Sequence, residues 1–310
     1  MPSDRTKILS SVIAHSSLRP SFYCGFMVSD RPPVALVTGG SAGLGFVIAR
    51  KLLDAGYSVV IVGRDSGRLD DAMVRLDPER CLSRTDGVGQ SLSCFSCDLT
   101  DAEAVEQLLS NTLESHDRLD VLVNCVGASD RGLLENLEAD RVEFLFRQNV
   151  ITALLCSQKS LVALEKTGGV IVNIGSLASK VGARYIGAYA IAKHALAGMT
   201  QQLRMEVKPR GIHVCLVSPG PIRRDDAGQR YHQSIDGLPA QAARPGGGTR
   251  VKGLPPERVA DAVLSAIKHR RPDMVLPRYL RLLIMLGHAS PRLGDWLLLK
   301  FTSPKDDASA

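Results

Sequence analysis

The chain has 310 residues, of which 45% are hydrophobic, and this is enough for one large α/β domain with a sizeable core or for two small ones. Its formal net charge is +6, but the basic residues are scattered, only 5% of the residues are aromatic and no zinc-finger spacing occurs, which argues against nucleic acid as a partner. The seven cysteines lie mostly in apolar runs and the seven histidines form no ligand cluster, so we expect reduced thiols and no metal site.

Residues 1–33 are predicted to be a disordered leader outside the fold. The apolar stretch from Ile8 to Ala14 is interrupted by serines, lacks a convincing cleavage site and is too short to cross a bilayer. Met27 stands just before the first predicted strand and is a second candidate for the start of translation. A transit peptide is the alternative, against which Asp4 and Asp30 argue. We expect a cytoplasmic protein.

From residue 34 onward, short apolar runs alternate with helical patterns, which is typical of a parallel sheet with helices on both faces. The runs are almost continuously apolar, as expected for strands buried on both faces. The first helix is predicted at Gly45–Ala55. The predicted strands are Val34–Thr38, Ser58–Val62, Ser93–Cys97, Asp120–Asn124, Val170–Ile174, Ile212–Val217 and Met274–Leu276. We therefore predict a doubly wound parallel sheet of the Rossmann type, forming a single domain over residues 34–277.

A polar stretch rich in Gly, Pro and Arg lies between Arg223 and Pro256 and includes Gly246-Gly-Gly248. Its length without periodicity predicts a mobile lid over the active site, at about residues 222–256, or a disordered insert.

Residues 278–310 are predicted to be a basic and apolar C-terminal extension that is helical in part. It contains two apolar runs, Leu282–Leu286 and Trp296–Leu299, which Gly287, Pro291 and Gly294 interrupt, so it is not a spanning helix. The flanking cations are Arg278, Arg281, Arg292 and Lys300. Two interpretations stay open: helices that pack on the sheet or on another subunit, and helices that lie in a membrane interface.

A glycine-rich segment, Thr38-Gly-Gly-Ser-Ala-Gly43-Leu-Gly45, follows the first predicted strand and leads into the first predicted helix. Glycine permits a tight turn and the close approach of a pyrophosphate, and the helix N-terminus offers free N–H groups at the positive end of its dipole. The segment therefore predicts a dinucleotide-binding turn.

The end of the second predicted strand indicates which dinucleotide is bound. An Asp or Glu there commonly holds a free ribose 2′-hydroxyl, but this chain has Gly63 followed by Arg64. A guanidinium suits a 2′-phosphate. NADP(H) is therefore favoured over NAD(H), although Asp65 follows immediately.

Tyr189 and Lys193 lie four residues apart in a run, Ile186 to Val207, that contains few helix breakers. Residues four apart share a helix face, so the phenol and the ammonium can face one cleft. A neighbouring ammonium lowers the pKa of a tyrosine, ordinarily about 10, toward the range in which acid/base catalysis is efficient. Ser176 follows the fifth predicted strand and can hydrogen-bond a substrate carbonyl.

Two more groups follow predicted strands. Asp98-Leu99 follows the third, where Asp98 can bond the adenine amino group or cap the next helix. Asn124 and Gly127 end the fourth, at the edge of the sheet where ligands bind in this architecture.

With these motifs in this order, the chain resembles the short-chain dehydrogenase/reductase family over about Val34 to Pro277. The family pattern Thr-Gly-x-x-x-Gly-x-Gly begins at Thr38, and the family's Pro-Gly after the sixth strand matches Pro219-Gly220. The resemblance implies a catalytic tetrad of Asn149, Ser176, Tyr189 and Lys193. The implied cofactor contacts are Thr38, Gly39, Ser41, Gly43, Leu44, Gly45, Arg64, Asp98, Leu99, Asn124, Gly127, Tyr189, Lys193, Pro219, Gly220 and Ile222.

The resemblance also implies hydride transfer between a nicotinamide and a carbonyl or alcohol carbon. Ser176 is implied to polarise the carbonyl and Tyr189 to transfer the proton. Lys193 is implied to lower the pKa of Tyr189 and to hold the nicotinamide ribose, and Asn149 to hold a water that links Lys193 to solvent.

The chain departs from the family pattern at several positions. Cys125-Val126 stand between Asn124 and Gly127, and Ala42 stands where NADP-dependent relatives often carry a basic residue. Ile222 and two arginines stand where a threonine commonly contacts the carboxamide.

The sequence thus predicts an NADP(H)-dependent oxidoreductase, a ketone reductase with a lipid-like substrate, whose exact substrate and direction stay open. The alternatives are an NAD-dependent alcohol dehydrogenase and a non-enzymatic dinucleotide sensor, against which the presence of Tyr189 and Lys193 argues. A homo-oligomer and a peripheral membrane contact through the tail are both compatible with the sequence.

Overall fold

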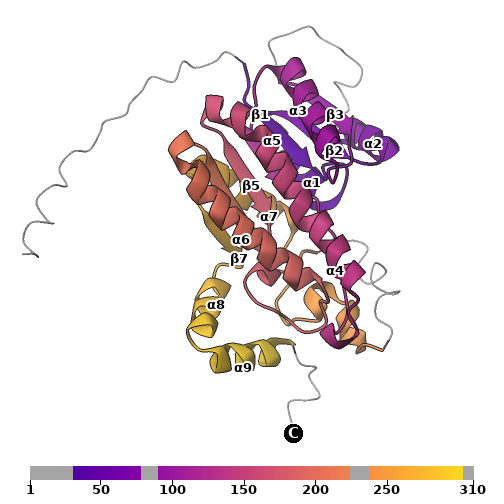
Figure 1. Ribbon diagram of the computed structural model, residues 1–310, viewed down its shortest axis with the longest axis vertical. Helices are drawn as coiled ribbons and strands as arrows, with labels where there is room; N and C mark the ends of the chain where they lie inside the picture. Colours follow the sequence, from indigo (N-terminus) through magenta and orange to yellow (C-terminus); the bar gives the residue numbers. More distant parts are fainter. Residues whose placement is uncertain (1–30, 78–89, 224–236, 303–310) are drawn as a thin grey trace, which may run out of the picture. The chain divides into compact units, whose positions relative to one another are not determined.

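The computed structural model describes residues 31–77, 90–223 and 237–302 (Figure 1). The predicted leader up to residue 30, residues 224–236 of the predicted lid and the last eight residues of the predicted extension lie outside the described residues.

The described residues form one sheet of seven parallel strands in the order β3-β2-β1-β4-β5-β6-β7. Ala35 of β1 pairs with Val59 of β2 on one side and with Val121 of β4 on the other, so the chain builds the sheet outward in both directions from β1. The strands are β1 (Val34–Thr38), β2 (Ser58–Gly63), β3 (Leu92–Ser96), β4 (Val121–Asn124), β5 (Val170–Ile174), β6 (His213–Pro219) and β7 (Asp273–Leu276). This topology confirms the predicted doubly wound Rossmann sheet.

Helices cover both faces of the sheet (Figure 1). They are α1 (Gly43–Asp54), α2 (Ser66–Leu76), α3 (Ala102–His116), α4 (Ala139–Phe146), α5 (Thr152–Thr167), α6 (Tyr189–Val207), α7 (Pro256–His269), α8 (Leu280–Ala289) and α9 (Pro291–Thr302). Alternate strand side chains point to opposite faces: Ala35 and Val37 pack with α1, α2 and α7, whereas Val34 and Leu36 pack with α3, α5 and α6. The strands are therefore buried on both sides.

The predicted strand bounds agree with the structure to within two residues, and β5 agrees at both ends. Helix α1 begins at Gly43, two residues earlier than predicted. The last two glycines of the glycine-rich segment therefore lie in the first turn of this helix.

The two ends of the predicted lid are bonded to each other. The amide N of Arg223 donates to the carbonyl O of Leu254 at 2.8 Å, and the amide N of Leu254 donates to the carbonyl O of Pro221 at 2.7 Å. Between them, Gly246, Gly247 and Gly248 all have positive φ, from 68° to 82°. A Cβ on Gly247 would lie 2.8 Å from the carbonyl O of Arg184, so this backbone packs closely against the loop before α6.

None of the helices in the described parts of the chain has the length and apolar character needed to cross a membrane.

Candidate active site

The carboxyl ends of the strands open into one cleft of about 2380 Å³. Its walls come from the turn between β1 and α1, the ends of β2 and β3, the loop after β4, the start of α6 and the segment after β6. The C-terminal helices α8 and α9 complete the lining. Ligands of doubly wound sheets bind at this edge, next to the point where the strand order reverses.

The glycine-rich turn lies on one wall of this cleft and fits a phosphate. Gly39 has a φ of +69°, and a Cβ on Gly45 would lie 2.1 Å from the carbonyl O of Gly39, so both positions require glycine. A Cβ on Gly43 would meet no atom within 4 Å, because it would point into the cleft. Ala42, at the N-cap position, has no side-chain acceptor for the first N–H groups of α1. This helix end is therefore a suitable anion site.

Thr38 holds this turn without lining the cleft. Its Oγ1 accepts from the amide N of Cys125 at 2.9 Å and from that of Val126 at 3.2 Å. The threonine thus fastens the end of β1 to the end of β4.

The cleft is basic where β2 ends. Arg64 and Asp65 both line it, and Oδ1 of Asp65 caps α2 by accepting from the amide N of Arg68 at 3.0 Å. Arg50 and Arg75 also line it and stack on the ring of Phe46, with guanidinium carbons 5.2 and 4.4 Å from the ring centroid. No local sequence signal indicates this pair of arginines, because the two lie on different helices.

Asp98 and Leu99 line the cleft at the end of β3. Oδ1 of Asp98 accepts from the amide N and from Oγ1 of Thr100, both at 2.9 Å, and these bonds lower the pKa of the carboxyl group. An ionised acceptor is thereby held at the expected adenine end.

Asn124 does not reach the cleft. Its Nδ2 donates to Oδ1 of Asn173 at 2.8 Å and to Oγ of Ser157 at 3.1 Å, between the sheet and α5. The reason is the strand alternation: Asn124 shares a face with Leu122, which packs against α3, α5 and α6. The Asn124 side chain, which was expected to contact the cofactor, therefore lies in a buried polar network outside the cleft lining. Gly127 lines the cleft as expected.

Ser176, Tyr189 and Lys193 come together in the cleft. Ser176 caps the short turn η4 (Leu177–Ser179), and its Oγ accepts from the amide N of Ala178 at 3.1 Å, which leaves the hydroxyl proton for a ligand. Tyr189 is the first residue of α6, and Nζ of Lys193 lies 5.7 Å from the centroid of its ring.

Lys193 is almost fully buried, with 4% of its surface exposed. Its Nζ donates to the carbonyl O of Ile174 at 2.9 Å. Burial lowers the pKa of this ammonium to about 8, although the neighbouring Cys125 acts in the opposite direction. The pKa of Lys193 therefore lies close to neutral pH, and the residue lines the cleft.

Asn149 lies in a π-helical turn, η3 (Arg147–Ile151), between α4 and α5. Its Nδ2 donates to the carbonyl O of Ala128 at 2.9 Å and to that of Leu145 at 2.8 Å, so the orientation of its amide is fixed. Its Oδ1 is buried and has no hydrogen-bond partner among the described residues. A Cβ on Gly127 would lie 2.6 Å from this oxygen and 3.4 Å from Nζ of Lys193. Both polar atoms thus border Gly127, and the oxygen is available to a water or ligand.

Pro219, Gly220 and Ile222 line the cleft after β6. The amide N of Gly220 donates to the carbonyl O of Leu276 at 2.7 Å, which fastens this segment to the end of β7.

Two buried residues that the sequence did not indicate, Asp130 and Arg131, support the start of α6 and the lid segment. Oδ1 of Asp130 accepts from Nη2 of Arg141 at 2.9 Å, and a Cβ on Gly187 would lie 2.7 Å from its other oxygen, Oδ2. Nε of Arg131 donates to the carbonyl O of Ala242 at 2.7 Å, and Arg131 itself lines the cleft. The one available signal was a charged pair six residues after the end of the fourth strand.

The C-terminal helices contribute an apolar wall that the sequence did not predict. Leu283 and Ile284 of α8 and Leu297, Leu298 and Phe301 of α9 line the cleft. The amide N of Arg250 donates to the carbonyl O of Phe301 at 2.9 Å, which connects α9 to the lid segment.

Comparisons with known proteins agree with this architecture. The profile of the short chain dehydrogenase family matches residues 33–234. The zebrafish (Danio rerio) protein dehydrogenase/reductase SDR family member 7B is 29% identical over 87% of this chain and 82% of its own length.

Two solved structures are each 25% identical. A short-chain dehydrogenase from Streptomyces avermitilis superposes with a TM-score of 0.69 over 88% of this chain and 97% of its own. An actinorhodin polyketide ketoreductase variant with NADPH superposes with a TM-score of 0.68 over 81% of this chain and 98% of its own. The dinucleotide-binding sheet, the cleft at its carboxyl edge and these matches together identify the chain as an oxidoreductase of the short-chain dehydrogenase/reductase family, which uses NAD(P) cofactors.

Proposed function

We propose that this protein is an NADP(H)-dependent reductase of an apolar, lipid-like ketone. The observation that carries the proposal is that Ser176, Tyr189 and Lys193 line the same cleft as the glycine-rich turn. Acid/base groups and an anion-binding helix end therefore face one volume.

In the proposed reaction, the hydroxyl of Ser176 donates to the substrate carbonyl and fixes its position. Tyr189 gives its proton to the oxygen as negative charge develops there, and the ammonium of Lys193 stabilises the phenolate that remains. Oδ1 of Asn149 holds a water through which Lys193 exchanges protons with solvent, since this oxygen has no partner among the described residues. When bound, the nicotinamide supplies the hydride for the carbonyl carbon.

The preference for NADP(H) rests on the charges at the end of β2. Arg64 and Asp65 both line the cleft, but Oδ1 of Asp65 is engaged as the cap of α2. Arg50 and Arg75 add positive charge to the same lining. A 2′-phosphate gains from these guanidinium groups, whereas a free 2′-hydroxyl would gain more from an available carboxylate.

The substrate class follows from the apolar wall of α8 and α9. Leu283, Ile284 and Phe301 offer hydrocarbon surface within the cleft. We therefore expect kcat/KM for methyl ketones to increase with chain length, by about fourfold for each CH₂ group that this wall covers, because burying a CH₂ contributes about 0.8 kcal/mol.

The first experiment is a titration of the purified protein with NADPH and with NADH, followed by nicotinamide fluorescence. We expect NADPH to bind more tightly and Arg64→Asp to abolish the preference. Arg258→Asp, which changes an exposed arginine of α7, is the matched control and should preserve it. Equal or tighter binding of NADH would overturn the cofactor assignment.

The second experiment separates an enzyme from a binding protein. We expect Tyr189→Phe to reduce turnover of a long-chain ketone by 10²–10⁴-fold while NADPH affinity stays within a few-fold of the wild-type value. Turnover that survives this change would contradict the assigned role of Tyr189.

A further inference from the structure

Helix α8 has two apolar faces. Leu280, Leu283 and Ile284 face the cleft. On the opposite side, Leu282 and Met285 are 61% and 60% exposed. A helix of a globular protein normally has one apolar side, so the outward side of α8 needs a separate explanation.

Helix α9 repeats this arrangement. Leu297, Leu298 and Phe301 line the cleft, whereas Trp296 and Leu299 are 54% and 47% exposed. We define the outer surface of α8–α9 by its exposed apolar side chains: Tyr279, Leu282, Met285, Leu286, Leu293, Trp296 and Leu299. They make up half of the large apolar side chains that the described residues expose. Such a concentration within 21 residues indicates an interaction surface.

The outer surface belongs to a firmly held pair of helices. A Cβ on Gly287 of α8 would lie 3.1 Å from the Cα of Gly294 of α9, so the two helices pack at close range. Nε2 of His288 lies 2.8 Å from the carbonyl O of Lys180, and Thr302 is buried. The exposed apolar side chains are therefore presented by an ordered unit.

The charges beside this surface indicate its partner. Arg278, Arg281, Arg292 and Lys300 are exposed, and Asp295 is the acidic residue among them, which gives residues 278–302 a net charge of +3 with histidine neutral. Nζ of Lys300 lies 4.8 Å from the ring centroid of Trp296. Long cationic side chains on an apolar helix face can extend to lipid headgroups while their stems stay in contact with apolar surface.

We propose that the outer surface of α8–α9 binds the surface of an anionic phospholipid bilayer. A second copy of the chain is the less suitable occupant, since in a two-fold dimer the same positive patches would face each other. In the bilayer-bound state, the inner sides of the same helices still line the cleft. An apolar substrate dissolved in the membrane would thus have only one layer of helix between itself and the active site.

The experiment is co-sedimentation of the full chain with vesicles of phosphatidylcholine, with and without about one third phosphatidylserine. We expect binding to the serine-containing vesicles that weakens as salt is raised. Leu282→Ser/Trp296→Ser should lower the partition coefficient at least tenfold, because apolar burial is lost. Arg281→Gln/Arg292→Gln should lower it by about fivefold for each cation removed. Met205→Ser on α6, where Met205 is 66% exposed, is the matched control and should bind as wild type.

Vesicle binding is measured without turnover, so its result is independent of the proposed reaction, and NADPH binding by each variant verifies folding. Wild-type protein that stays in the supernatant with both vesicle types would overturn the proposal. If Met205→Ser lost as much vesicle binding as the α8–α9 variants, the proposal would be overturned as well. A dimer that the Leu282→Ser/Trp296→Ser change dissociates in light scattering, without vesicle binding by the wild type, would assign the surface to a second copy instead.

Discussion

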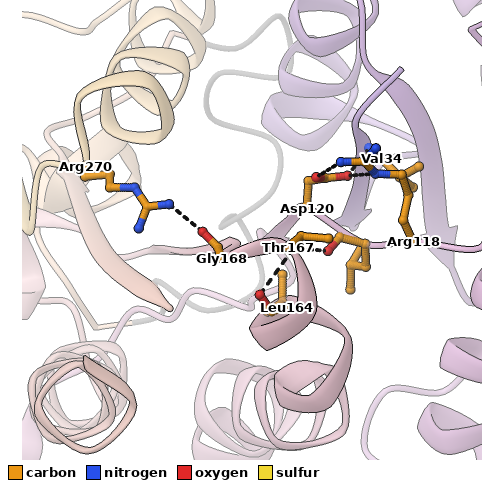
Figure 2. Close-up of polar contacts among 8 residues, drawn as sticks. Val34, Arg118, Asp120, Leu164, Thr167, Gly168 and Arg270 are labelled. Carbon is orange, nitrogen blue, oxygen red and sulfur yellow. Dashed lines mark hydrogen bonds and ion pairs between the residues drawn. The ribbon is translucent and has the colours of Figure 1, made fainter. Parts of the chain in front are cut away.

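The two edges of the sheet use polar groups in opposite ways. At the amino edge, before the strands begin, Asp120 accepts from the amide N of Val34 at 2.8 Å and from Nε and Nη2 of Arg118 at 2.9 and 2.6 Å (Figure 2). Thr167 donates to the carbonyl O of Leu119. The guanidinium of Arg270 donates to the carbonyl O of Gly168 (Figure 2). These contacts connect α5, α7 and the starts of β1, β4 and β5, so their role is to hold the layers together.

At the carboxyl edge, polar atoms are left for a ligand. Oδ1 of Asn149 is buried without a partner among the described residues, and Lys193 is buried with a lowered pKa. An unpaired buried polar atom costs about 1–3 kcal/mol, so this edge reduces stability where the other edge adds to it. We therefore expect changes at the carboxyl edge to affect turnover and changes at the amino edge to affect stability.

The largest expected effect belongs to Lys193→Met. Turnover should fall by 10²–10⁴-fold, because the proposed reaction loses the charge that stabilises the Tyr189 phenolate. The protein should nevertheless gain about 1–3 kcal/mol of stability at pH 7, since a buried ammonium is removed. Urea unfolding of the apo-protein and steady-state kinetics measure the two effects. Lys159→Met, which changes an exposed lysine paired with Glu106, is the control and should change turnover and stability only slightly.

The stability gain of Lys193→Met should depend on pH in a defined direction. The pKa of this ammonium is about 8 in the folded state and 10.5 as its ordinary value. Between these values the unfolded state binds more protons, so wild-type stability increases as the pH rises. The advantage of the variant should be complete below pH 8 and disappear toward pH 10.5. If the stability difference between variant and wild type stayed constant over this pH range, burial of the Lys193 ammonium could not be its cause.

The second effect in size is that of Gly127→Ala. The new Cβ would lie 2.6 Å from Oδ1 of Asn149, whose side chain two hydrogen bonds hold in place. We expect a loss of about 10²-fold in kcat, because a small displacement in a positioned site has an effect of this order. Gly198→Ala in α6, where a Cβ meets nothing within 4 Å, should keep full turnover and stabilise the helix slightly. Equal kinetics for both variants would show that the space beside Gly127 is not needed.

The fold could be predicted closely because the strands are short, apolar and buried on both faces. All five residues of β5 are buried, and the predicted bounds of this strand agree with the structure. Other features depend on distant contacts. The run Gly246–Gly248 predicts a lid, and its structure shows why glycine stands there: all three φ values are positive, and a Cβ on Gly246 or Gly247 would lie 2.8 Å from Pro221 or from the carbonyl O of Arg184. Local sequence cannot specify such contacts.

The same limit applies to the site. The spacing of Tyr189 and Lys193 on one helix is a local signal, and the family resemblance implied the other two members of the tetrad; all four line the cleft. Asn124 was assigned to the cofactor from its position at a strand end, but the face to which it points is decided by the polar network with Asn173 and Ser157. The two apolar faces of α8 and α9 could not be separated either, since apolar residues on opposite sides of a helix do not show which side faces the cleft.

The third prediction concerns the amino edge. Asp120→Ala should cost about 2 kcal/mol of stability and leave kcat unchanged, because it removes the acceptor of one backbone amide and one guanidinium. Glu165→Ala removes the partner of the more exposed Arg210 and should cost less than about 1 kcal/mol. Urea unfolding with and without NADPH, together with kinetics, distinguishes the two edges. A loss of turnover in Asp120→Ala at full stability would show that the amino edge does not act on stability alone.

The smallest expected effect is that of Arg270→Gly, in which two contributions oppose each other. Arg270 ends α7 with a φ of +47°, which favours glycine, but its guanidinium donates to the carbonyl O atoms of Gly168 and Gly211. Glycine relieves the strain of the positive φ but removes both side-chain hydrogen bonds, so the net loss of stability should be below about 1 kcal/mol. Arg270→Met loses the bonds and keeps the strain, and should cost about 1 kcal/mol more than glycine. The three unfolding curves should therefore fall in the order wild type, Arg270→Gly, Arg270→Met, from the most to the least stable, at equal turnover. The reverse order of the variants would mean that the contacts of the remaining side chain outweigh the backbone conformation at this helix end.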